Sequence, residues 1–229
     1  MKLKTISTLC FAASTMLAAS SAMAWESEDG AWSTSANVAL SSEYVWRGVG
    51  QSGSDPALSG GLDIAHSSGF YAGTWASNIE NDDGSIEIDY YAGFGGEFGD
   101  SGVTYDVGGL YYDFPGITDF DAFEVYGFVG YSFLTAGVSY SLDLFDADYA
   151  GQEDNIYYQL DAGYDIGPVS LAAGVGRYDY DLESSTDYTN WYVGASTELA
   201  GFGLDVTYHD TNLDGSDSDA VVFTISKSM

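Results

Sequence analysis

Long stretches of alternating apolar and polar residues limit the possible folds of this chain more than any other feature of its sequence. Between positions 86 and 98 almost every second residue is apolar, and the residues between them are mostly acidic or glycine. The same alternation recurs over 103–111 and 156–166. Because successive side chains of a strand point to opposite faces, a period of two predicts strands with one apolar and one polar face.

The same pattern along the rest of the chain predicts about twelve strands, each long enough to cross a membrane at a tilt. They are expected at residues 34–46, 57–66, 70–79, 86–98, 103–112, 123–133, 135–143, 155–166, 169–178, 189–199, 202–210 and 220–228. Splitting or merging one hairpin would give ten or fourteen. An even number places both ends of the chain on one side, as in bacterial single-chain barrels.

The connections between these strands alternate strictly in length. The short ones are 66–69, 99–102, 133–134, 167–168 and 200–201, and the long ones lie near 48–56, 80–85, 113–122, 143–154, 179–188 and 210–219. Acidic residues concentrate in the long set. Long loops at one end and tight turns at the other are typical of outer-membrane barrels. The expected fold is therefore an all-β, transmembrane, antiparallel up-and-down β-barrel.

A secreted soluble β-barrel or sandwich is the alternative fold, because strand alternation alone is common to both classes. Aromatic residues near the strand ends favour the membrane barrel, in which they form girdles at the two interfaces. The expected girdle residues are Tyr44, Trp46, Tyr111, Tyr157, Tyr158, Trp191 and Tyr208 at one rim and Phe70, Phe98, Tyr131, Phe133 and Phe202 at the other.

The first residues have the anatomy of a secretory signal peptide. Lys2 and Lys4 form a basic start, an apolar run follows over 6–19, and small residues at 22–24 suit a cleavage site. The apolar run is shorter than the ~20 residues that a membrane helix needs. We expect residues 1–24 to be removed. Residues 25–229 would then form the barrel domain in the outer membrane of a Gram-negative bacterium, in contact with its lipid.

Charge and residue content exclude several classes of function. Outside the leader only Arg47, Arg177 and Lys227 are basic, whereas the chain has 35 aspartates and glutamates, so nucleic acid is a poor partner. The single cysteine lies in the leader. Neither of the two histidines, His66 and His209, lies at a spacing from other residues that is typical of a catalytic nucleophile or of a set of metal ligands. Neither an enzyme nor a cofactor is expected.

Acidic residues dominate the polar face of the predicted strands. The candidate pore-lining residues are Glu43, Arg47, Asp63, Glu87, Asp89, Asp106, Glu124, Asp161 and Asp205. Carboxylates that ring a narrow pore favour cations and repel anions. The alternative is that these side chains only hydrate or plug the interior, which a small barrel must fill. Arg47 is expected either to pair with a carboxylate, such as Glu43 on the same strand face, or to guide an anionic group.

The acidic long loops would also attract divalent cations. Residues 210–215 reproduce the first half of a calcium-binding loop, but Val221 stands where the bidentate glutamate belongs. Aspartate, asparagine and glycine are equally common in ordinary hairpin loops. Diffuse attraction of divalent ions is therefore expected rather than a specific metal site.

The stretch 41–78 resembles a known family. Its Ser42-Glu43-Tyr44, Arg47-Gly48, Gln51-Ser52, Asp55-Pro56-Ala57, Gly60-Gly61-Leu62-Asp63 and Ser68–Asn78 segments are similar to the N-terminal signature of the TorF family of candidate porins, also known as the Gcw_chp family. This resemblance implies an outer-membrane barrel and a channel, without identifying a solute. The expected function is passive diffusion of small solutes or ions, with a preference for cations. The alternative is a non-conducting structural or receptor barrel.

Overall fold

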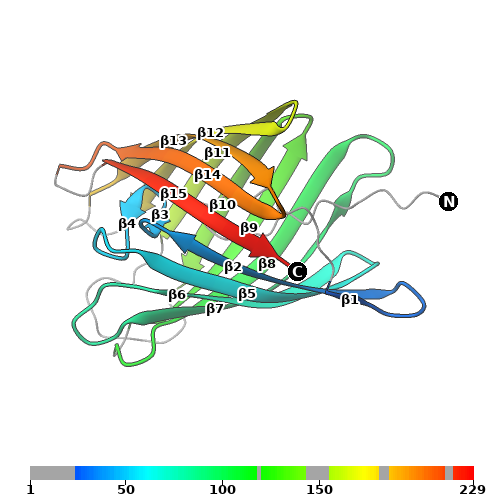
Figure 1. The fold of residues 1–229 in the computed structure, drawn as a ribbon, viewed down its shortest axis with the longest axis horizontal. Helices are drawn as coiled ribbons and strands as arrows, with labels where there is room; N and C mark the ends of the chain where they lie inside the picture. The colour runs from blue at the N-terminus through cyan, green and yellow to red at the C-terminus, as the bar shows by residue number, and fades with distance from the viewer. Residues whose placement is uncertain (1–23, 118–119, 143–154, 181–185, 215–218) are drawn as a thin grey trace.

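The computed structural model describes residues 24–117, 120–142, 155–180, 186–214 and 219–229, and within them twelve strands form a closed antiparallel barrel (Figure 1). The barrel strands are β2 (Trp32–Ser41), β5 (Ala57–His66), β6 (Phe70–Asn78), β7 (Ile86–Glu97), β8 (Val103–Asp113), β9 (Ala122–Tyr131), β10 (Leu134–Leu142), β11 (Asn155–Ile166), β12 (Val169–Tyr180), β13 (Tyr188–Leu199), β14 (Phe202–Thr211) and β15 (Asp219–Ser228). The described residues include no helix that is long and apolar enough to span a membrane.

The strands follow one another around the barrel in sequence order. β2 closes the ring, because it pairs with β15 on one side and with β5 on the other. The predicted bounds of β5 to β15 agree with the structure to within two residues, which confirms the all-β, up-and-down barrel. We call the end of the barrel that carries the long connections the loop end, and the opposite end the turn end.

The two faces of the barrel wall differ as the alternation predicts. On β7, Ile86, Tyr90 and Phe94 point outward and are exposed, whereas Glu87 and Asp89 point inward and are buried. Large apolar side chains stay exposed around the outside; Leu62 on β5 and Phe223 on β15 are each 62% exposed. An exposed apolar surface of this extent is unusual for a soluble protein and indicates contact with an apolar environment.

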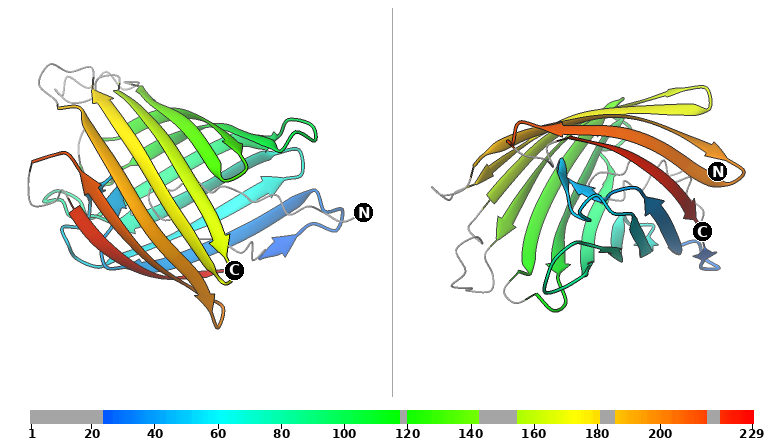
Figure 2. Two further views of the ribbon diagram at one scale, coloured as in Figure 1. Left: turned by 90° about the horizontal axis from the view of Figure 1, so that it is seen from above. Right: turned by 60° about the vertical axis from the view of Figure 1, so that its left-hand side comes forward.

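The stretch from Ser42 to Pro56 is where the structure departs from the expectation. β2 ends at Ser41 instead of continuing to Trp46, and the chain then turns into the barrel. There β3 (Val45–Trp46) and β4 (Val49–Gly50) form a small hairpin, which lies inside the ring of strands in the right-hand view of Figure 2. We call residues 42–56 the inward segment. The prediction that residues 48–56 form an external loop is therefore wrong.

Local backbone geometry explains the hairpin within the inward segment. Arg47 and Gly48, its two central residues, have φ angles of 48° and 88°. Positive φ at both central residues is the signature of the type I′ turn, the tightest connection between two antiparallel strands. The alternation of Glu43 to Trp46 has the same period as a wall strand, which is why it predicted a continuous strand.

Two further differences concern short elements and aromatic residues. β1 (Trp25–Glu26) pairs with the start of β2 and was not predicted, because two residues are too few to show a period. Tyr44 and Tyr157 are buried in the lumen, and Trp46 packs there between buried aromatic side chains, so their assignment to an outer girdle is wrong. Tyr158 and Trp191 at the loop end, and Phe70, Phe98, Tyr131, Phe133 and Phe202 at the turn end, are exposed.

Candidate functional site: the loop-end lumen

The inward segment packs against aromatic side chains of the wall at the loop end of the lumen. Trp46 contacts two buried clusters, one centred on Leu110, Tyr112, Tyr126 and Phe128 and the other on Tyr157, Tyr178 and Tyr188. Its ring centre lies 6.2 Å from that of Tyr112 and 5.8 Å from that of Tyr178. These rings stand on strands from different parts of the wall. The indole of Trp46 thus bridges them across the lumen.

Gly48 lets the inward segment approach the wall more closely than another residue would. A Cβ atom at this position would lie 2.6 Å from Asn190 Cβ and 2.6 Å from Thr211 Cγ2, which are on β13 and β14. On another side of the segment, a cavity of only about 20 Å³ remains between Tyr44 and the wall residues Trp75 and His209. The inward segment therefore narrows the lumen at the loop end.

Arg47 forms a buried ion pair with Glu124 on β9. Its Nη2 atom lies 2.6 Å from Glu124 Oε2, and the two side chains are only 6% and 4% exposed. The guanidinium carbon also lies 4.5 Å from the ring centre of Trp46 and 4.3 Å from that of Tyr157. Ring faces attract a cation most strongly where water is excluded. Arg47 does pair with a carboxylate, but the prediction that Glu43 is its partner is wrong.

Glu43 instead holds the bend of the inward segment. Its Oε1 atom accepts hydrogen bonds from the backbone N–H of Ser52 at 2.9 Å and from the Ser52 hydroxyl at 2.7 Å. Ser52 Oγ also accepts a hydrogen bond from the backbone N–H of Tyr44 at 3.0 Å. Both Glu43 and Ser52 are buried. These bonds join the two ends of the hairpin and fix its position.

Glu87 and Asp89 stand beside the Arg47 ion pair, on the inward face of β7. Glu87 is 3% exposed and accepts a hydrogen bond of 2.9 Å from the Tyr44 hydroxyl. Asp89 is 7% exposed and lies within electrostatic range of Glu87 and Glu124, and its Oδ1 atom has no hydrogen-bond partner among the described residues. The structure thus brings Arg47, Glu87, Asp89 and Glu124 together in one place.

The other four candidate carboxylates point into the lumen at separate places. Each accepts a hydrogen bond from a hydroxyl group: Asp63 from Tyr91 at 2.5 Å, Asp106 from Tyr71 at 2.6 Å, Asp161 from Tyr192 at 2.8 Å and Asp205 from Thr207 at 3.0 Å. The tyrosine partners were missing from the sequence-based set, because only charged residues were chosen as pore-lining candidates. Like the carboxylates, these tyrosines occupy inward-facing positions of their strands, and the alternation along each strand was the signal that could have identified them.

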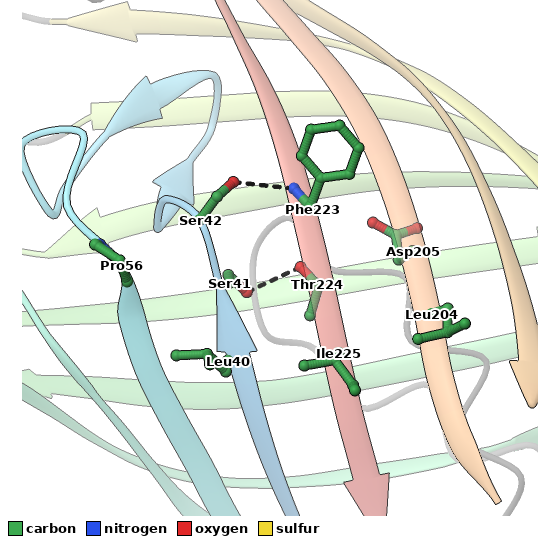
Figure 3. Close-up of a pocket in the computed structure, with 9 residues that line it drawn as sticks. All are labelled: Leu40, Ser41, Ser42, Pro56, Leu204, Asp205, Phe223, Thr224 and Ile225. Carbon is green, nitrogen blue, oxygen red and sulfur yellow. Dashed lines mark hydrogen bonds between the residues drawn. The ribbon is translucent and has the colours of Figure 1, made fainter. Parts of the chain in front are cut away.

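A cavity of about 420 Å³ interrupts the wall where the inward segment leaves it (Figure 3). Because β2 ends at Ser41, the seam between β2 and β15 continues only through Ser42, whose backbone N–H donates to the Phe223 carbonyl at 2.9 Å. The Ser42 hydroxyl accepts from the Phe223 N–H at 3.0 Å. Exposed apolar side chains such as Leu40 and Ile225 border this cavity. Asp205 is the one candidate carboxylate that lines this cavity, which does not include the group of Glu87, Asp89 and Glu124.

The histidines and the half calcium motif do not join this site as ligands of a metal. His66 contacts Ser68 and Trp32 at the turn end, whereas His209 is buried in the lumen with its ring centre 5.8 Å from that of Tyr192. In the described part of the chain, no three histidine, cysteine or acidic residues are placed to hold a metal ion. Gly215 of the half motif lies outside the described residues, as do all the acidic residues of the loop at 143–154.

Comparison with known proteins gives a family and a fold. The sequence profile of a family described as "Bacterial protein of unknown function (Gcw_chp)" matches residues 26–229. No curated protein matches the sequence. Among solved structures, the barrel is similar to a KdgM porin, with a TM-score of 0.55 and 8% identity over 85% of this chain and 97% of that one. It is also similar to a NanC porin, with a TM-score of 0.58 and 10% identity over 83% and 97% of the two chains.

Proposed function

We propose that this chain, which belongs to the Gcw_chp family, is an outer-membrane channel for small solutes that is narrowed at its loop end by the inward segment. The observation that carries this proposal is the closed barrel with an apolar outer face and an acidic inner face. The porin fold of the two structural neighbours supports it. Residues 1–24 act as the export signal, and residues 25–229 form the barrel in contact with outer-membrane lipid.

The proposed channel prefers cations. Eight of the nine candidate pore-lining residues are carboxylates, and the ninth, Arg47, is neutralised by Glu124. The interior field is therefore negative, which concentrates cations and excludes anions in a narrow passage. Small inorganic ions and small organic cations fit such a passage. The transport step is diffusion, and no chemical reaction is assigned to the lumen.

We expect the reversal potential in a potassium chloride gradient to show this preference. The refolded protein in a planar bilayer should give a reversal potential of the sign that potassium-selective current produces. The paired substitution E87Q/D89N should move this potential toward zero, because it removes two inward carboxylates beside the inward segment. D100N, an exposed carboxylate in the turn between β7 and β8, is the control and should leave the potential unchanged. A chloride-selective reversal would contradict the cation preference.

A non-conducting structural or receptor barrel is the second candidate. The close packing of the inward segment favours it, since Gly48 and Trp46 fit tightly against the wall. In a barrel with this second function, the loop-end surface would bind a partner and side chains would fill the lumen. Stable insertion into a bilayer without any current would favour it over the channel.

A further inference from the structure

The loop-end lumen holds more negative than positive charge. Glu87 and Asp89 on β7 and Glu124 on β9 are buried carboxylates, and Asp89 lies within electrostatic range of both of the others. The guanidinium of Arg47 forms an ion pair with Glu124. The Tyr44 hydroxyl, a neutral group, donates a hydrogen bond to Glu87. Within the part of the chain that the structure describes, no group donates a hydrogen bond to the Oδ1 atom of Asp89.

A buried carboxylate of this kind is ionised at low cost only when a hydrogen-bond donor or a cation binds it; otherwise it takes up a proton. Burying a carboxylate without a hydrogen-bond donor costs several kcal/mol, more than burying an unpaired neutral group. Asp89 is more than nine-tenths buried, and no described side chain donates to its Oδ1 atom. A cation that carries N–H donors would supply the missing hydrogen bond and stabilise the ionised form of these carboxylates.

The aromatic surroundings define the kind of cation. Tyr112 is the register partner of Asp89 on β8, and Tyr44, which donates to Glu87, lies against Trp75 with their ring centres 5.3 Å apart. The neighbouring Arg47 guanidinium already shows a nitrogen cation held by one carboxylate and several ring faces. Ring faces favour weakly hydrated organic cations, whereas calcium and magnesium need a cage of oxygen ligands.

We propose that Asp89, together with Glu87, binds the ammonium or guanidinium group of a small organic cation inside the lumen. The bound group donates to Asp89 Oδ1 and lies near Glu87, beside the aromatic residues Tyr44 and Tyr112. This inference rests on the proposed channel function and names the solute class for it. The Arg47 pair next to the site keeps Glu124 neutralised, so the incoming cation is directed to Asp89.

The test is a calorimetric titration of the refolded, detergent-solubilised protein with n-butylammonium chloride and with butylguanidinium chloride. Sodium chloride at the same ionic strength provides the reference. We expect saturable binding of at least one organic cation that sodium does not reproduce. D89N should weaken this binding by about tenfold or more, because it removes a charge-assisted hydrogen bond. D100N should bind as the unmodified protein does.

Folding of the variants is checked by the heat-dependent shift of the barrel on a gel. D89N removes a buried unpaired charge and is expected to fold. E87Q is the second variant, and it should also weaken binding, though by less. Absence of saturable binding to the unmodified protein would overturn the proposal, as would equal binding by D89N. Conductance without binding refutes this site and leaves the channel intact, whereas binding without conductance supports the site and refutes the channel.

Discussion

Replacing Arg47 with methionine should lower the free energy of unfolding of the barrel by about 3–5 kcal/mol. The substitution keeps a side chain of similar length at a position where φ is 48°, so the backbone conformation is equally demanding for both residues. It removes the only charged partner that the described residues offer to Glu124, whose side chain is 4% exposed. The carboxylate of Glu124 is then left buried without compensation, which accounts for most of the loss.

Urea unfolding in phospholipid vesicles, followed by tryptophan fluorescence, measures this effect. The double variant R47M/E124M is the matched control, because replacing a buried ion pair with apolar residues of similar size is often close to neutral. We expect it to recover most of the lost stability. A loss in R47M below about 1 kcal/mol would mean that the ion pair is solvated, since exposed pairs contribute only that much. The described packing of the inward segment would then be wrong.

Removal of the inward segment should raise the conductance of the channel several-fold. Ser41 and Ala57 are register partners, so residues 43–55 can be replaced by the dipeptide Asn-Gly, which suits a two-residue hairpin. The replacement removes Trp46 and Arg47 from the lumen and lets water reach the carboxylates of the wall. Because the lumen carboxylates become hydrated, they need no other partner. Single-channel step size is the measurement.

Two comparisons make the conductance result decisive. The shortened variant must retain the heat-dependent gel shift of a folded barrel, and D100N at the turn end should show the step size of the unmodified protein. If the shortened variant folds and its step size equals that of the unmodified protein, the inward segment does not narrow the conducting path. The site described at the loop end would then lie beside the path.

The barrel could be predicted from sequence because its wall obeys one local rule. Each wall strand must separate an apolar outer face from a polar inner face, and the alternation of residues such as Ile86 and Glu87 records this directly. Turn glycines and the alternating loop lengths indicate that consecutive strands pair with one another, which gives the order of the strands. β2 beyond Ser41 shows the limit of the rule, because a hairpin inside the lumen alternates just as a wall strand does.

The inward residues of the candidate site could be predicted from the sequence, but their partners could not. The parity of the strands identified Glu87, Asp89 and Glu124 as inward residues, and the structure places all three in the lumen. The pairing of Arg47 with Glu124 spans 77 positions and depends on how the inward segment crosses the barrel, which no local pattern encodes. The tyrosine partners of the other carboxylates likewise depend on which strands face each other.

The most direct test of the central claim is the current through the unmodified, refolded protein in a planar bilayer, recorded as single insertion events. We expect discrete conductance steps, because a closed barrel with an acidic lumen provides a fixed path for cations. Stable insertion, verified by the gel shift and by protease resistance of vesicle-bound protein, without any steps would contradict the channel. The barrel would then serve as a filled structural or receptor element.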